Sequence, residues 1–531
     1  MDQLSLLFVL LFGAVVTVPL GERLSLPPPV LMTVAGILVA FLPFVPEVDL
    51  PPEYILPLVL PPVLYAAVRR TSWRQFTANI RPILLLAVAL VFVTTAAVAA
   101  VAQAAVPGLP LAPAIALGAL VAPPDPVAAT AVAGRLGLPR RMVSILEGEG
   151  LFNDVTAITL YHVAVTAAVT GTFSAPRAGG ELVLSAAVAI AVGAALGWAT
   201  TSLFGLLGDV TLRTGLTLLA PFAAYVLAEE LLGSGVLAVL VTALYLGERG
   251  ADADDVTGRL TGRSFWAVVD TLVTGVAFGL IGLELHVVLG TVSGRWDELL
   301  PAAALVLAVV VGVRLLWLLP ATWLARRLHR RTDYAEEIPL TWRETVVMWW
   351  SGIRGVASVA LALALPLTVD GGGAFPERGA IVFIGFVVVI GTLLIQGLTL
   401  PWLAGRLGVR ADSDAEEAFE HELAVRAAKA AKRRLREIEE SQDVPDEISE
   451  ALARRAYDIG ARISPRIARD EWRENVAARA ERMRRVHRLY GELLSAARHE
   501  VLDARSEPGA DPEVVDRVLR DLDERSLPHG R

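Results

Sequence analysis

The sequence predicts an all-α membrane protein that crosses the bilayer about thirteen times and continues into a charged helical tail. Its composition is apolar, with 54% hydrophobic and 19% charged residues among 531. Half of the 102 charged residues (47 basic and 55 acidic) lie in residues 411–531. Charge therefore makes up about 42% of this part and about 12% of residues 1–410, whereas soluble domains carry about 25%. We expect a transmembrane domain over residues 1–410 and a cytoplasmic helical tail over residues 411–531.

Composition also excludes several classes of protein. The chain has no cysteine, which rules out disulfides, thiolate metal sites and cysteine nucleophiles. The net charge of −8 offers no basic field, so we expect no nucleic-acid partner. Met1-Asp2-Gln3 lacks the positive charge of a cleavable signal, so the first apolar run is expected to be a retained span.

The apolar segments give the expected spans, because a membrane helix needs about 20 mostly apolar residues. The eighth and ninth are short and divided only near Gly233-Ser234-Gly235. The thirteen segments are 4–20, 30–46, 54–68, 82–106, 111–135, 143–170, 181–205, 213–232, 233–247, 264–290, 300–326, 341–367 and 379–405.

Arginines predict the orientation, because basic residues favour cytoplasmic loops. With the N-terminus outside, the outer loops hold only Arg177, Arg295 and Arg378. An odd number of spans then places the tail in the cytoplasm. The inner loops hold Arg23, Arg69, Arg70, Arg74, Arg81, Arg135, Arg140, Arg141, Arg213, Arg249, Arg259, Arg263, Arg326, Arg327, Arg330 and Arg331.

The sequence of the tail predicts a helix over Val425–Glu440 and shows a longer helical pattern from Ser464 to about Ala504. A solvated extension and a regulatory or dimer contact are both compatible with this pattern. Apolar residues available for such a contact are Val486, Leu489, Leu493 and Leu494.

Ionisable groups inside spans are costly and are functional candidates by default. The fifth segment contains Ala122-Pro123-Pro124-Asp125-Pro126, where prolines remove backbone donors and interrupt the helix. Interrupted helices that carry polar residues build ion sites in many secondary transporters. Asp125 could instead cap the second half-helix, and the two interpretations are compatible.

The sixth segment begins with Glu147-Gly148-Glu149-Gly150 and continues through Asn153-Asp154. Helical spacing places Glu149 and Asn153 one turn apart, while Glu147 and Asp154 share a face. Asp154 lies furthest into the span, and a carboxyl there can exchange a proton for a hard cation such as sodium. A salt-bridged structural cluster is the alternative, and it suits Glu149 better than Asp154.

The twelfth segment contains Ser351-Gly352-Ile353-Arg354-Gly355. The glycines permit close approach or unwinding, and a buried Arg354 needs an acidic partner or carbonyls in a tightly packed crossing. Two interrupted spans at corresponding places indicate an inverted-repeat transporter. Arg314 lies in the middle of the eleventh segment without a partner that the sequence identifies.

These motifs resemble the monovalent cation:proton antiporters of the sodium/hydrogen exchanger (NhaP/NHE) type, in its bacterial form. Leu60–Tyr65 looks like the family's LPP-leucine segment, and Pro124–Ala128 looks like its DPVA site. Gly148–Asp154 resembles its GES-LLND motif, and Gly352–Pro366 resembles its G-x-RG-A helix. The four motifs occur in the family's order and cover about residues 4–405.

The resemblance implies an inverted-repeat antiporter fold in the cell membrane, dimeric, which exchanges sodium (or potassium or lithium) for protons without a cofactor. Asp154 would bind the cation or proton, and Asp125 would orient the site or hold a bridging water. Glu149 would pair with Arg354 and lock the core helices, and Glu147 would be at most a supporting acid. Asn153 replaces the second aspartate of electrogenic relatives, which suggests electroneutral exchange.

Two positions depart from the family pattern. Pro124 stands where a threonine often precedes the DP, so only its carbonyl can serve, and Gly150 lacks the hydroxyl of the usual serine. Potassium/proton exchange by the same site is the alternative to sodium. An intramembrane hydrolase is a further alternative, but the sequence contains none of the motifs of such enzymes. A sensor or channel is another, and it would have to explain two interrupted helices that converge on one carboxylate without a continuous pore.

Overall fold

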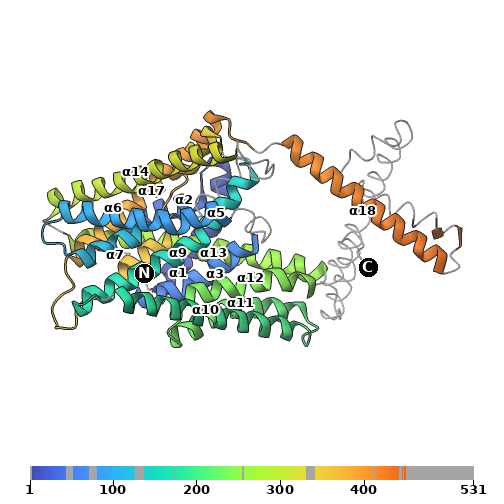
Figure 1. Ribbon diagram of the computed structural model, residues 1–531, viewed down its shortest axis with the longest axis horizontal. Helices are drawn as coiled ribbons and strands as arrows, with labels where there is room; N and C mark the ends of the chain where they lie inside the picture. The colour runs from blue at the N-terminus through green and yellow to red at the C-terminus, as the bar shows by residue number, and fades with distance from the viewer. Residues whose placement is uncertain are drawn as a thin grey trace, which may run out of the picture. The chain divides into compact units, whose positions relative to one another are not determined.

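A computed structural model describes the chain as helices joined by short connections (Figure 1). The chain divides into two compact units, Met1–Arg410 and Ala411–Arg531. The described residues are 3–24, 26–42, 52–70, 80–125, 137–173, 175–253, 256–292, 294–329, 341–410, 413–441 and a few positions between 445 and 452. Their helices are α1 (Gln3–Leu24), α2 (Pro28–Ala40), α3 (Pro52–Arg70), α5 (Ile80–Leu84), the π-helix η1 (Leu85–Ala89), α6 (Leu90–Ala105), α7 (Leu111–Val121), α9 (Arg140–Thr170), α10 (Ala175–Phe204), α11 (Val210–Glu230), α12 (Gly235–Ala253), α13 (Val256–Thr291), α14 (Trp296–His329), α15 (Trp342–Trp350), α16 (Val356–Leu363), α17 (Arg378–Leu407) and α18 (Ser413–Ser441).

The all-α prediction is confirmed for the described residues, and each of the thirteen predicted segments contains at least one helix. Seven helices are long and apolar enough to cross a bilayer, and α2, α7 and the part of α3 from Pro57 to Arg69 are shorter apolar helices. The number of crossings stays a prediction. In the second unit, α18 contains the predicted Val425–Glu440 helix, and residues 453–531, with the four apolar candidates for a contact, lie outside the described residues.

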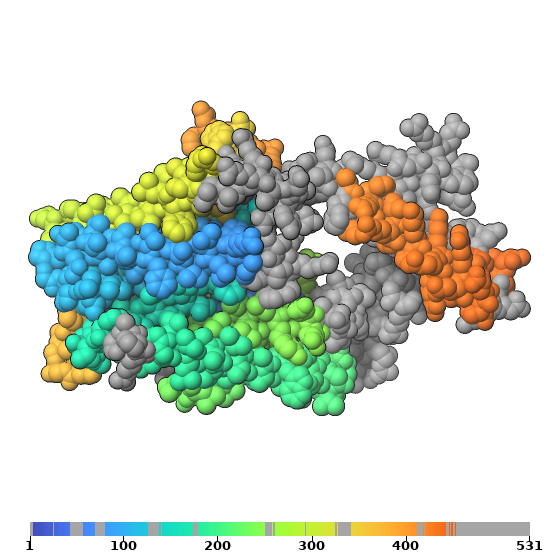
Figure 2. Space-filling view, viewed as in Figure 1, coloured from blue at the N-terminus to red at the C-terminus, as the bar shows by residue number. Residues whose placement is uncertain are grey.

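The surface of the first unit carries large apolar side chains. Phe92 on α6 and Trp323 on α14 are more than half exposed, as is Trp198 on α10. The side chains of α6 and α14 lie against each other on the face in Figure 2. Exposed aromatic and aliphatic groups at this density suit a lipid environment rather than water.

The two predicted interruptions are confirmed. The α7 helix ends at Val121, and Pro123, Pro124 and Asp125 continue in a non-helical conformation. The twelfth segment divides into α15 and α16, which are separated by the non-helical residues 352–355. Prolines in one segment and glycines in the other explain why neither continues as a single helix.

The helices around the interruptions bring distant parts of the chain together. The α9 helix contacts α7, and α16 contacts α3, α7, α13 and α17. In Figure 1, α10, α11 and α12 lie along one edge of this unit, while α6 and α14 lie along the opposite edge. The interruptions therefore lie inside the bundle, where protein must satisfy the freed backbone groups.

Candidate functional site

The two interrupted segments bind each other through their freed backbone groups. The Asp125 amide donates a 2.6 Å hydrogen bond to the Ile353 carbonyl. The Arg354 guanidinium donates from Nε to the Val121 carbonyl at 2.9 Å and from Nη2 to the Ala122 carbonyl at 3.0 Å. Arg354 thus fills the C-terminal end of α7, whose last carbonyls have no partner within the helix. This network joins both breaks at one point.

Gly355 lies directly against the carboxylate of Asp125. A Cβ atom at position 355 would lie 1.6 Å from Asp125 Oδ2 and 2.6 Å from Asp125 Cβ. Only a residue without a side chain allows this approach, so the backbone of the second interruption forms a wall beside the carboxylate of the first.

Asn153 ties α9 to the first interruption. Its side chain is fully buried, and Nδ2 donates a 2.8 Å hydrogen bond to the Pro124 carbonyl. Because α7 ends at Val121, the Pro124 carbonyl lies beyond the helix and has no partner in its ladder. The amide therefore stabilises the non-helical turn and positions the neighbouring residue of α9, Asp154.

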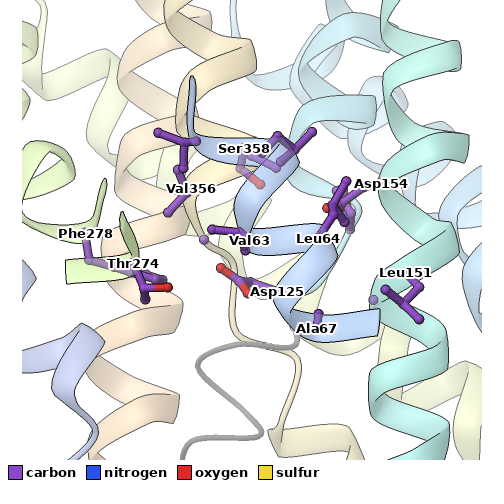
Figure 3. Close-up of a pocket in the computed structure, with 16 residues that line it drawn as sticks. Val63, Leu64, Ala67, Asp125, Leu151, Asp154, Thr274, Phe278, Val356 and Ser358 are labelled. Atoms are coloured by element: carbon purple, nitrogen blue, oxygen red, sulfur yellow. The ribbon is translucent and has the colours of Figure 1, made fainter. Parts of the chain in front are cut away.

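Asp125 and Asp154 line one buried cavity (Figure 3). The cavity offers about 40 Å³ to the centres of water-sized molecules, enough for a small ion and water. Most of its wall is apolar and comes from α3, α9, α13 and α16. Among the described residues that line it, the polar side chains are Asp125, Asp154, Thr274 and Ser358. Oxygen ligands in an apolar wall suit a hard cation.

Glu149 pairs with Arg314 and not with Arg354, so the predicted ion pair is wrong in its partner. Arg314 binds both carboxylate oxygens of Glu149, with Nη2 at 2.8 Å from Oε2, and both side chains are at most 2% exposed. Arg314 Nε also donates to the Met348 carbonyl at 3.3 Å. The sequence could not make this assignment, because Arg354 is satisfied by carbonyls and leaves Glu149 to the arginine on α14.

The remaining predicted residues lie at the cavity, beside the buried arginines, or away from both. Gly150 lines the cavity, and a Cβ at Gly352 would lie 2.7 Å from Arg314 Cδ, so Gly352 lets the two buried arginines approach. Glu147 is partly buried on α9 and is not among the residues that line the cavity. Val127 and Ala128 of the DPVA segment lie outside the described residues.

Sequence reasoning missed three polar residues. Thr274 and Ser358 line the cavity, and Thr274 Oγ1 lies 3.4 Å from Oδ1 of Asp270, one turn earlier on α13. Asp270 had a detectable signal, because it is an ionisable residue inside the tenth predicted span. Thr274 and Ser358 had none, since single hydroxyls are common in membrane helices.

Two interrupted helices that meet beside a buried carboxylate and a partly buried one, within an all-helical bundle, define a secondary transporter for a hard cation. Comparison with known proteins agrees: residues 7–406 match the family described as "Sodium/hydrogen exchanger, transmembrane". The chain belongs to the sodium/hydrogen exchanger family, and it is a multi-pass membrane protein of the cation/proton antiporter class.

Relatives extend over most of the chain. An uncharacterised Na⁺/H⁺ exchanger of Mycobacterium tuberculosis is 33% identical over 525 residues, covering 98% of this chain and 94% of the relative. The Na⁺/H⁺ antiporter ApNhaP of Aphanothece halophytica is 30% identical over 406 residues, covering 76% of this chain and 74% of the relative. The sodium proton antiporter MjNhaP1 of Methanocaldococcus jannaschii shares the fold, with a TM-score of 0.60 at 20% identity over 76% of this chain and 98% of that one.

Proposed function

We propose that the chain exchanges cytoplasmic sodium for external protons by alternating access, with Asp154 as the group that binds either ion. The observation that carries this proposal is the cavity that Asp125 and Asp154 both line at the crossing of the two interrupted helices. A carboxylate in an apolar wall needs a positive partner, and a proton and a sodium ion can each supply one charge. Competition for one carboxylate couples the two fluxes.

Asp125 has a different role in this proposal. Its amide is held by Ile353, and Gly355 lies against its carboxylate, so the group is fixed in place. We assign it to orient the site or hold a bridging water, with the Pro124 carbonyl and Asn153 completing the frame. Because Asn153 is neutral, Asp154 alone changes its proton content, and exchange is one sodium for one proton.

The other parts of the chain fit the same proposal. Residues 1–410 form the transmembrane exchanger domain, and residues 411–531 form a cytoplasmic tail, with the N-terminus outside. The Glu149–Arg314 pair joins α9 to α14 and fixes the helix that carries Asp154. The protein acts as a homodimer in the cell membrane, in sodium and pH homeostasis.

The test uses the full chain in everted membrane vesicles that hold a proton gradient, with a pH-sensitive dye. Sodium and lithium are expected to release protons, and a larger response to potassium would establish the potassium/proton alternative. Asp154→Asn is expected to abolish the response. Asp297→Asn makes the same change of charge at an exposed residue of α14 and is expected to respond like the wild type. Activity in Asp154→Asn vesicles would refute the mechanism.

Electroneutrality and the tail have their own tests in proteoliposomes. Collapsing the membrane potential with valinomycin and potassium is expected to leave sodium-driven proton flux unchanged, whereas a change in rate would show that net charge moves. A chain that ends at Arg410 is expected to retain exchange, and complete loss with normal folding would make the tail part of the transport machinery.

A further inference from the structure

Ser358 places a hydroxyl in the cavity that Asp125 and Asp154 line. It is 1% exposed and lies on α16, three residues after Gly355, whose backbone contacts the Asp125 carboxylate. Residues three apart share one face of a helix, so Ser358 extends the wall that Gly355 begins. Figure 3 labels Ser358 together with Asp125 and Asp154 among the residues that line the cavity.

Ser358 has no hydrogen-bond partner among the described residues. Two buried hydroxyls near it do have one: Ser351 donates to the Val347 carbonyl at 2.7 Å, and Thr392 donates to the Val389 carbonyl at 3.0 Å. Thr95 and Ser144 are also buried without a partner, but they are not among the residues that line the cavity. A buried hydroxyl without a partner is costly, so its place in the cavity calls for a ligand.

The local backbone explains why Ser358 does not bond to its own helix. Serine in a helix normally donates to the carbonyl three or four residues earlier. Those carbonyls belong to Gly355 and Arg354, which precede the first residue of α16, and Gly355 has φ −141° and ψ −148°. Because α16 begins only after Gly355, both carbonyls belong to the interruption, and the hydroxyl forms no hydrogen bond to either of them.

The chemistry of the cavity indicates what this hydroxyl binds. Thr274, the other hydroxyl on the wall, is directed toward Asp270. Gly150, on the α9 side, has no side chain to offer. Ser358 thus offers an unpartnered hydroxyl oxygen to an ion held by the two carboxylates, and a neutral ligand adds affinity without adding charge.

We propose that the Ser358 hydroxyl is a ligand of the transported cation, directly or through one water in the cavity, and that it sets the affinity for small monovalent cations. This assignment rests on the proposed exchange at Asp154. A hydroxyl oxygen accepts no proton at physiological pH, so Ser358 contributes to cation binding and not to proton binding.

The test compares Ser358→Ala, Ser358→Thr and the wild type in proteoliposomes, with sodium, lithium and potassium each varied against the exchange rate. Ser358→Ala is expected to raise the half-saturating sodium concentration roughly fivefold or more, the loss expected from one hydrogen-bonding ligand. The maximal rate and the pH of half-maximal exchange at saturating sodium should stay near the wild type. Ser358→Thr keeps the hydroxyl and should retain wild-type affinity.

A matched control removes a hydroxyl that is already satisfied. Thr159 on α9 donates to the Val155 carbonyl at 2.8 Å and is not among the residues that line the cavity, so Thr159→Val should leave sodium affinity unchanged. A second measurement does not depend on transport: the sodium concentration that half-maximally raises the Tm of the purified full chain should increase in Ser358→Ala by the same factor.

The outcomes distinguish a failure of the Ser358 assignment from a failure of the proposed cation/proton exchange. A wild-type chain that exchanges sodium while Ser358→Ala keeps its half-saturation within twofold would overturn the role of Ser358 alone. A folded Ser358→Thr that loses affinity as Ser358→Ala does would overturn it as well, since the hydroxyl would then not be the cause. A wild-type chain that exchanges no monovalent cation would overturn the proposed function and this inference with it.

Discussion

Two arginines in the membrane unit are equally buried and are neutralised in different ways. Arg314 and Arg354 are each 2% exposed. Arg314 binds the carboxylate of Glu149, whereas Arg354 donates to three carbonyls, those of Val121, Ala122 and Gly352. The first is an ion pair between α14 and α9, and the second is a cation placed on the open C-terminal end of an interrupted helix.

The difference shows how a broken helix can hold a charge without consuming a carboxylate. The last carbonyls of a helix lack partners and carry partial negative charge, so they attract a cation. Because α7 ends inside the protein, its end accepts Arg354, and neither arginine binds Asp154. The Asp154 carboxylate is thereby left in the wall of the cavity.

Among the changes that test how the two arginines are neutralised, removal of Glu149 is expected to have the largest effect on stability. Glu149→Ala leaves Arg314 buried and unpaired, which should destabilise the fold by about 3–5 kcal/mol. The measurement is the Tm and the yield of monodisperse protein in detergent. The double variant Glu149→Met with Arg314→Met removes both charges and should recover much of the loss. Equal losses in the single and double variants would show that the pair does not act as an ion pair.

Removal of Arg354 is expected to cost less in stability and more in transport. Arg354→Met leaves neutral carbonyls without donors, and we expect a loss of about 2–3 kcal/mol. Exchange should nevertheless be lost, because the guanidinium joins the end of α7 to the second interruption. Thermal stability and sodium-driven proton flux are measured on the same preparation. A stability loss larger than that of Glu149→Ala would reverse the comparison.

Gly355→Ala tests the contact between the second interruption and Asp125 without changing any charge. The added Cβ would overlap the Asp125 carboxylate, so the site must shift, at a cost of about 1–3 kcal/mol. Exchange should fall by roughly a hundredfold, because displacements of about 1 Å have such effects at positioned sites. Gly312→Ala on α14 has open space around its Cβ and serves as the control. Comparable rates in both variants would contradict the close approach.

The smallest effect is expected at a third arginine, which lies on the surface. Arg295 binds Glu377 at 2.8 Å and Glu298 at 3.2 Å, with 42% of its side chain exposed. Arg295→Gln should cost less than about 1 kcal/mol, because solvent and salt screen exposed pairs. A loss comparable to that of Glu149→Ala would show that burial does not decide the strength of these pairs.

The pH dependence of this surface pair follows from the direction of its pKa shift. The hydrogen bonds that Arg295 donates, first to Glu298 and then to Glu377, raise the pKa of Arg295 above its already high ordinary value. When folding raises the pKa of a basic group, the group stabilises the folded state at every pH below its pKa in the unfolded chain. That stabilisation is lost only as the pH rises through the pKa of the group in the folded protein. The difference in Tm between wild type and Arg295→Gln should therefore be the same at pH 6 and pH 9, and smaller in high salt.

Much of this architecture was predictable because its causes are local. Apolar segments and proline or glycine runs predict helices and their breaks, so each predicted segment contains a helix in the described residues and both interruptions are found, while the number of spans stays a prediction. The pairing of Glu149 was not predictable, since its partner lies 165 residues away. Ser358 was missed for a similar reason: its hydroxyl becomes unusual only where the helix begins.

The sequence alone determined that this chain is a helical membrane protein with two broken spans and a few charges inside them, because hydropathy and backbone restriction act residue by residue. Only the tertiary structure decided which charge neutralises which. A buried cation can be satisfied by a carboxylate or by helix-end carbonyls at similar distances, and the choice depends on which group the folded chain brings near. That choice assigned Glu149 to Arg314 and left Asp154 facing the cavity.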